Sequence, residues 1–162
     1  MKYRLLVSTL IAAVVATIGT AGQSKPSVQG AWKTVAITVT GPSARTLSSL
    51  QPNLTVLSAR HYARVEVQSD GPRPLLPDIT NATADQLRAV WGPFVAEAGT
   101  YEFTGDTLTV HPIAAKNPAA MVSGAVIVYA STLEGSTLTL TQQRNQSGPF
   151  PNPVTFKLMR VE

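Results

Sequence analysis

The segment Ser131–Leu140, with the sequence STLEGSTLTL, decides the fold of this 162-residue chain. Its Thr and Leu residues alternate around a Gly-Ser pair, and alternation with period two around a short glycine turn is typical of two antiparallel strands in a hairpin. The segment Glu102–Val110, EFTGDTLTV, repeats the pattern with Gly-Asp at the turn. The two segments predict a repeated hairpin geometry rather than a solenoid, because two copies are too few for a stacked repeat.

Further strands on both sides of these hairpins follow from similar runs of β-branched and apolar residues. Eight strands are predicted in all, at 31–40, 54–58, 62–68, 99–104, 107–112, 124–133, 136–142 and 154–161. Eight antiparallel strands joined mostly in sequence close into a small barrel whose interior holds side chains or one small ligand. An open sandwich is the alternative, but a closed barrel leaves no unpaired strand edges.

One short helix is predicted in mid-chain, between the third and fourth strands. Thr83 is placed to cap its first turn, and Gln86 is placed to complete a capping box ahead of an apolar stripe that reaches Trp91. Gly92-Pro93 ends or kinks the helix, because proline disrupts helical hydrogen bonding. Residues 94–98 are expected to continue as a second short turn.

The N-terminus has the pattern of a secretory signal peptide. Lys2 and Arg4 precede the apolar run Leu5–Ile18, which gives way to small residues, and this order is typical of a segment removed on export. A retained anchor is the alternative, but the roughly 14 apolar residues fall short of the ~20 that a membrane-spanning helix needs. We therefore expect a signal peptide at 1–22, one barrel domain at 23–162, a periplasmic or secreted location, and no stable membrane span after cleavage.

The composition argues against several classes of site. The chain has no cysteine, which excludes disulfides, thiol catalysis and thiolate metal sites. It has only two histidines, and no local carboxylate spacing completes a ligand set, so neither a metal nor another cofactor is predicted. Without Lys2 and Arg4 the chain carries 11 basic against 9 acidic residues. Its arginines are scattered rather than clustered, which argues against nucleic-acid binding.

The first predicted strand opens with Gly30-Ala31-Trp32-Lys33, which resembles the Gly-x-Trp signature at the start of lipocalins. In that family a basic residue of the last strand packs across the tryptophan at the closed end of the barrel. Arg160 has the matching parity, and its neighbours on that strand face are apolar. The resemblance therefore implies that Trp32 and Arg160 close one end of the barrel.

Other stretches are similar more specifically to the bacterial lipocalin-like single-domain proteins, namely His61-Tyr62, Ala98-Gly99-Thr100-Tyr101-Glu102 and Asn117-Pro118. Together these stretches extend the resemblance over about residues 30–161. They imply an all-β, eight-stranded antiparallel up-and-down lipocalin-like barrel with one short helix inserted mid-chain. Two features depart from the ligand-carrying lipocalins: the lack of a disulfide and the mid-chain position of the helix.

Four aromatic side chains are the candidate ligand contacts: Tyr62, Trp91, Tyr101 and Tyr129. Each joins an apolar ring to a polar tip that can orient a ligand, and small-molecule pockets combine many apolar contacts with few polar ones. Core packing is the alternative for each of them. The first hypothesis is therefore an exported barrel that binds a small apolar or amphipathic molecule.

An enzyme of isomerase or hydrolase type, working in the same cavity, is the second hypothesis. His111 and Tyr101 are its acid/base candidates. His111 has no adjacent carboxylate or histidine, the carboxylates stand singly along the chain, and no nucleophile motif occurs, so we favour binding over catalysis. A third hypothesis is a structural or partner-binding envelope protein, which predicts a filled barrel and an exposed apolar patch.

Overall fold

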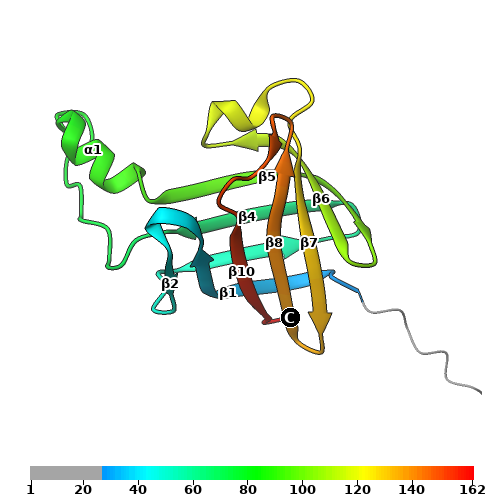
Figure 1. Ribbon diagram of the computed structural model, residues 1–162. Helices are drawn as coiled ribbons and strands as arrows, with labels where there is room; N and C mark the ends of the chain where they lie inside the picture. Colours follow the sequence, from blue (N-terminus) through cyan, green and yellow to red (C-terminus); the bar gives the residue numbers. More distant parts are fainter. Residues whose placement is uncertain (1–26) are drawn as a thin grey trace, which may run out of the picture.

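Eight antiparallel strands close into a barrel in the computed structural model, which describes residues 27–162 (Figure 1). The barrel strands are β1 (Gly30–Val39), β3 (Asn53–Leu57), β4 (His61–Val67), β5 (Phe94–Thr104), β6 (Thr107–Ala115), β7 (Ile127–Glu134), β8 (Thr137–Asn145) and β10 (Val154–Arg160). Neighbouring strands follow one another along the chain, and β10 closes the ring by pairing with both β8 and β1. The predicted all-β, eight-stranded antiparallel up-and-down barrel is confirmed. The predicted signal peptide, 1–22, lies outside the described residues.

Four short elements were not predicted from the sequence. They are the 3₁₀ turns η1 (Gly41–Ser43) and η2 (Pro118–Met121) and the strands β2 (Arg45–Leu47) and β9 (Gly148–Pro149). Strand β2 pairs with the second half of β1, whereas β3 pairs with its first three residues. The side-chain amide of Asn53 extends the β3 contact, because it accepts from Thr34 N at 2.6 Å and donates to Thr34 O at 3.1 Å.

The strand pairings divide the barrel into two halves of four strands. Only three residue pairs join β1 to β3, and four join β6 to β7. The six other barrel pairings contain five to eight residue pairs each. Strands β3 to β6 therefore form one half-sheet, and β7, β8, β10 and β1 form the other.

The predicted helix is α1 (Ala84–Trp91), and it begins with the predicted capping box. Thr83 Oγ1 accepts from Gln86 N at 3.2 Å, and Gln86 Oε1 accepts from Thr83 N at 2.8 Å. These two hydrogen bonds satisfy backbone donors that the first helical turn leaves free. Figure 1 shows that α1 extends away from the barrel wall.

The second short turn predicted at 94–98 is wrong, because β5 begins at Phe94 and pairs with β4 from its first residue. Lys116 fixes this passage from helix to strand. Its ammonium group donates to the carbonyl oxygens of Trp91, of Gly92 at 3.2 Å and of Phe94 at 2.8 Å. A lysine near a helix C-terminus stabilises carbonyl groups that lack a helical partner.

The two repeated hairpins also have the same backbone irregularities. Gly105 and Gly135 occupy the first central position of their turns with φ of 67° and 57°, as a type II′ turn requires. A bulge follows in each second strand, where Ile113 and Gln143 have no partner in the register. Bulges increase the local bend of a strand, so both hairpins curve at equivalent positions of the barrel wall.

Candidate ligand-binding site

Two adjoining cavities lie inside the barrel. The inner cavity has a volume of about 40 Å³, and its apolar lining comes mainly from Leu57, Leu108, Val110, Leu140 and Leu158. The outer cavity, nearer the open end, has a volume of about 270 Å³, and its apolar lining includes Ile37, Leu47, Val95, Ile127 and Val154. Four residues line both cavities: Arg64, Glu97, Tyr129 and Phe156. These four side chains therefore form the boundary between an apolar floor and the open end.

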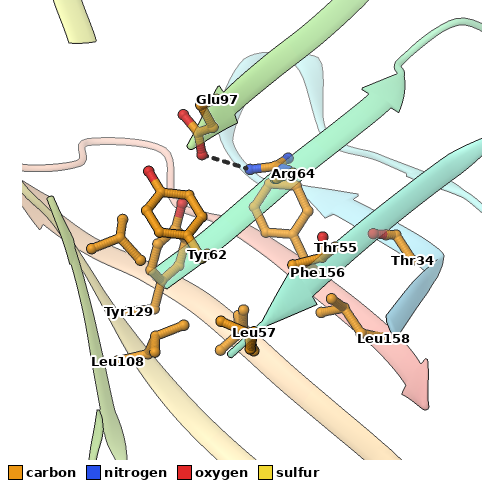
Figure 2. Close-up of a pocket in the computed structure, with 12 residues that line it drawn as sticks. Thr34, Thr55, Leu57, Tyr62, Arg64, Glu97, Leu108, Tyr129, Phe156 and Leu158 are labelled. Carbon is orange, nitrogen blue, oxygen red and sulfur yellow. Dashed lines mark ion pairs between the residues drawn. The ribbon is translucent and has the colours of Figure 1, made fainter. Parts of the chain in front are cut away.

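Arg64 is the centre of that boundary, and Figure 2 shows its guanidinium group beside the carboxylate of Glu97 and above the ring of Phe156. Its Nε donates to Glu66 Oε2 at 2.8 Å, while its Nη1 lies 3.8 Å from Glu97 Oε1. The guanidinium carbon lies 4.5 Å from the centre of the Phe156 ring, within the range of a cation–π interaction. Arg64 on β4 thus connects two carboxylates to an aromatic ring on β10.

The two carboxylates differ in their environment. Burial pushes the pKa of Glu66 upward, but the hydrogen bond and charge of Arg64 and a hydrogen bond from Gln68 outweigh burial and lower it. Burial raises the pKa of Glu97, the charge of Arg64 opposes this shift only in part, and the charge of Glu66 adds to it. Glu66 is therefore a firmly ionised partner of Arg64, and Glu97 is a carboxyl group that takes up a proton more readily.

Two tyrosines, Tyr62 and Tyr129, are further polar groups of the interior. Tyr62 is 5% exposed, and its hydroxyl has no hydrogen-bond partner within residues 27–162. Burial raises its pKa and also raises the pKa of Tyr129 to about 12, so both phenols are neutral at pH 7. The ring of Tyr129 packs edge-to-face on Phe156, with centroids 6.4 Å apart. Both tyrosines line the inner cavity, as the sequence analysis expected of them.

Trp91, predicted as a contact in the barrel cavity, lies elsewhere. It is on α1, outside the barrel, is 43% exposed and packs edge-to-face on Phe94. It lines an external groove with the proline-rich segment 72–76 instead. The prediction failed because α1 extends away from the barrel and does not lie across its mouth (Figure 1).

Tyr101 and His111, the acid/base candidates, do not line either interior cavity. The Tyr101 hydroxyl donates to the carbonyl oxygen of Ser58 at 2.6 Å, where it ties β5 to the β3–β4 turn. His111 is half-buried and follows Val110, whose side chain faces the inner cavity. Successive side chains of a strand point to opposite faces, so His111 lies on the outer face. Neither acid/base candidate therefore lines the cavities in which the enzyme hypothesis placed it.

The ionic cluster of Arg64, Glu66 and Glu97 was not predicted from the sequence. One available signal was parity in β4, since Arg64 and Glu66 share a face with Tyr62, which was expected inside. The opposite face carries Val65, which is 46% exposed and pairs with the equally exposed Leu54. The usual expectation that charged residues face solvent and valines face the core is inverted on this part of the barrel.

The closed end contains the contact that the resemblance implied. Trp32 is fully buried, and its Nε1 donates to the carbonyl oxygen of Val28 at 2.8 Å. The guanidinium carbon of Arg160 lies 4.2 Å from the centre of the Trp32 ring. Arg160 also donates to the carbonyl oxygens of Gln29 and, at 2.6 Å, of Ser27. The aromatic ring and the arginine therefore cover the barrel base together with the chain that precedes β1.

Two further properties concern residues 27–162 as a whole. Within this range no three His, Asp or Glu side chains gather in a way that could hold a metal ion. None of the helices in this range has both the length and the apolar character needed to cross a membrane.

Comparison with known proteins identifies no family for the chain. No family model matches it, and no curated protein matches it significantly. Among solved structures, it is similar to the crystal structure of an uncharacterized protein from Bacteroides eggerthii DSM 20697. That match has 8% sequence identity and a TM-score of 0.42, and it covers 82% of this chain and 98% of the other.

Proposed function

We propose that the chain is an exported, lipocalin-like protein that binds a small hydrophobic or amphipathic molecule inside its barrel. The observation that carries this proposal is the outer cavity, which has a volume of about 270 Å³ and a wall that combines apolar side chains with the polar groups of Arg64, Glu97 and Gln142. Small-molecule sites usually combine an apolar wall with a few convergent polar groups, in volumes of roughly 300–1,000 Å³. The volume of the outer cavity lies just below the lower end of that range, which favours a small ligand.

The small volume of the inner cavity also bears on where a ligand would lie. Its volume is about 40 Å³, and one ordered water needs roughly 10–15 Å³ measured in this way. It therefore has room for a small polar group or a few waters, while the bulk of a ligand belongs in the outer cavity. Arg64 and Glu97 then lie where one end of the ligand reaches the boundary between the cavities.

The alternative of a filled, partner-binding barrel has one observation in its favour. Leu54, Val56 and Val65 form an exposed apolar patch on the outer face of β3 and β4. That hypothesis also requires a barrel without cavities, and the interior has two of them. We therefore favour a binding site inside the barrel over one on its outer wall.

Displacement of a fluorescent apolar probe, 1-aminoanthracene, tests the proposal on the purified protein, together with native mass spectrometry and organic extraction. Ile127→Phe narrows the outer cavity and should weaken probe binding at least tenfold. Val65→Phe makes a similar change on the outer face and should leave binding unchanged. Thermal unfolding of both variants checks that the barrel forms. If the probe and a set of lipids and aromatic compounds all fail to bind, or if Ile127→Phe binds normally, the proposal is wrong.

A further inference from the structure

The charges at the boundary between the two cavities do not balance. Arg64 faces two carboxylates, Glu66 and Glu97. Its Nε lies 2.8 Å from Glu66, whereas its Nη1 lies 3.8 Å from Glu97, which is beyond the range of a hydrogen bond. Glu66 also accepts a hydrogen bond from Gln68. Arg64 is thus committed to Glu66, and within residues 27–162 the Glu97 carboxylate accepts no side-chain hydrogen bond.

The unpartnered hydroxyl of Tyr62 lies in the same region. Its side chain is 95% buried and lines the inner cavity, which Glu97 also lines. Figure 2 shows the Tyr62 ring and the Glu97 carboxylate on the same side of this cavity. A buried hydroxyl without a partner costs about 1–3 kcal/mol. The Glu97 carboxylate at the boundary and the Tyr62 hydroxyl oxygen in the inner cavity are therefore two hydrogen-bond acceptors that line the same cavity.

The other polar groups facing this region do not supply the missing cation. Tyr129, Gln68 and Gln142 are neutral side chains on the cavity walls. Arg45 lines the rim of the outer cavity, but it is exposed to solvent, which screens its charge. With Glu97 ionised, the buried cluster therefore has one negative charge in excess.

Resting on the function proposed above, we infer that the barrel selects small amphipathic amines, with the ammonium group bound by Glu97 and Tyr62 and the apolar part in the outer cavity. An ammonium group has three donors and no acceptor, which matches these two acceptors. Its bond to a carboxylate is charge-assisted and stronger than one between neutral groups. A ligand carboxylate in the same place would add a third negative charge around one guanidinium group.

Three ligands with the same chain and different polar ends test this inference: octylamine, octanol and octanoate. Each competes with 1-aminoanthracene for the purified protein at pH 7. Octylamine should bind at least about tenfold more tightly than octanol, which corresponds to one charge-assisted hydrogen bond of about 1.4 kcal/mol. Octanoate should bind more weakly than octanol.

Two substitutions on β5 test whether Glu97 is the group that selects octylamine over octanol. Glu97→Gln should abolish the preference for octylamine over octanol. Glu102→Gln removes an exposed carboxylate from the outer face of the same strand and should preserve the preference. Tyr62→Phe should reduce the preference for octylamine over octanol several-fold.

The possible outcomes separate the two proposals. If octanol and octylamine bind equally, or octanoate binds most tightly, the selection of amines is wrong while a binding function stands. A preference for octylamine that persists in Glu97→Gln also overturns the inference, because the selecting group then lies elsewhere. If no octyl compound displaces the probe and the probe itself fails to bind, the proposed function falls as well.

Discussion

Three arginines stack on aromatic rings within residues 27–162, and two of them, Arg160 and Arg64, lie at the closed end and in the interior of the barrel. The Arg160 guanidinium lies 4.2 Å from the Trp32 ring, and the Arg64 guanidinium lies 4.5 Å from the Phe156 ring. Arg160 donates to backbone carbonyl groups at the closed end. Arg64 faces two carboxylates between the cavities. One arginine–aromatic pair therefore closes one end of the barrel. The other pair belongs to the charged boundary between the two cavities.

The difference lies in the partners of each guanidinium. The backbone carbonyl groups that accept from Arg160 are neutral and fixed by the fold. These contacts therefore involve no carboxylate that needs a second cation. Carboxylates carry charge that burial makes unfavourable, and Arg64 has two of them for one cation. The Arg160 guanidinium thus has its hydrogen-bond partners within the chain, whereas the Glu97 carboxylate at the boundary can still accept a hydrogen bond from another molecule.

Trp32→Ala should have the largest effect on this comparison, because it removes the ring on which the closed end is built. Trp32 is fully buried, and truncation of a buried tryptophan lowers the free energy of unfolding by about 3–5 kcal/mol. Urea denaturation followed by circular dichroism measures the loss. A loss below about 1 kcal/mol would show that the ring contributes little to the barrel.

Arg64→Met should lower the free energy of unfolding by about 3 kcal/mol, because removing one member of a buried ion pair leaves the other without compensation. Glu66 is 2% exposed and would remain in the barrel without its cation. The double variant Arg64→Met with Glu66→Gln should regain part of the loss in the same denaturation experiment. If the double variant is as unstable as the sum of the single changes, the pair is not coupled.

Arg160→Met should have a smaller effect, about 1 kcal/mol, since the methionine still covers the indole and only the cation–π and backbone contacts are lost. Ligand binding should not change, because Arg160 lies at the closed end and lines neither cavity. Denaturation and probe titration of the same sample measure both quantities. A loss of binding would mean that the two ends of the barrel are coupled.

Glu97→Gln should have the smallest effect on stability, visible only in its pH dependence. The pKa of Glu97 in the folded protein is raised above its ordinary value of 4.5, so the folded state holds this proton more tightly than the unfolded state. The wild type should therefore lose stability as pH rises from 4.5 through the raised pKa. The variant lacks this ionisable carboxyl group, so its free energy of unfolding should fall less over the same pH window. Identical urea midpoints for the two proteins at every pH in this window would contradict the raised pKa of Glu97.

Sequence patterns predicted the barrel well where alternation and turn residues agree. The hairpins around Gly105 and Gly135 combine Thr/Leu alternation with the glycine that a type II′ turn requires. The first half of β5 was missed because Phe94–Ala98 has apolar or small residues on both faces, with Glu97 the exception. Strands β2 and β9, of three and two residues, are too short to show a period.

Half of the candidate site could be predicted. Tyr62 and Tyr129 were among the four aromatic residues expected on residue type to line the cavity, and both line it. The pairing of Arg64 with Glu97 depends on the register between β4 and β5, in which these two residues are direct partners. They are 33 positions apart, with a loop and a helix between them, so local alternation in either strand carries no information about that register.

The division of the barrel into two four-stranded halves bears on how the halves are held together. The short pairings β1–β3 and β6–β7 lie on opposite sides of the ring, and a seam with few backbone hydrogen bonds opens at lower free energy than a long one. Arg64 belongs to one half and Phe156 to the other, so their stacking contact crosses the interior between them. Separating the half-sheets along the seams would break that contact, so the stacking of Arg64 on Phe156 holds the two halves together at the boundary between the cavities.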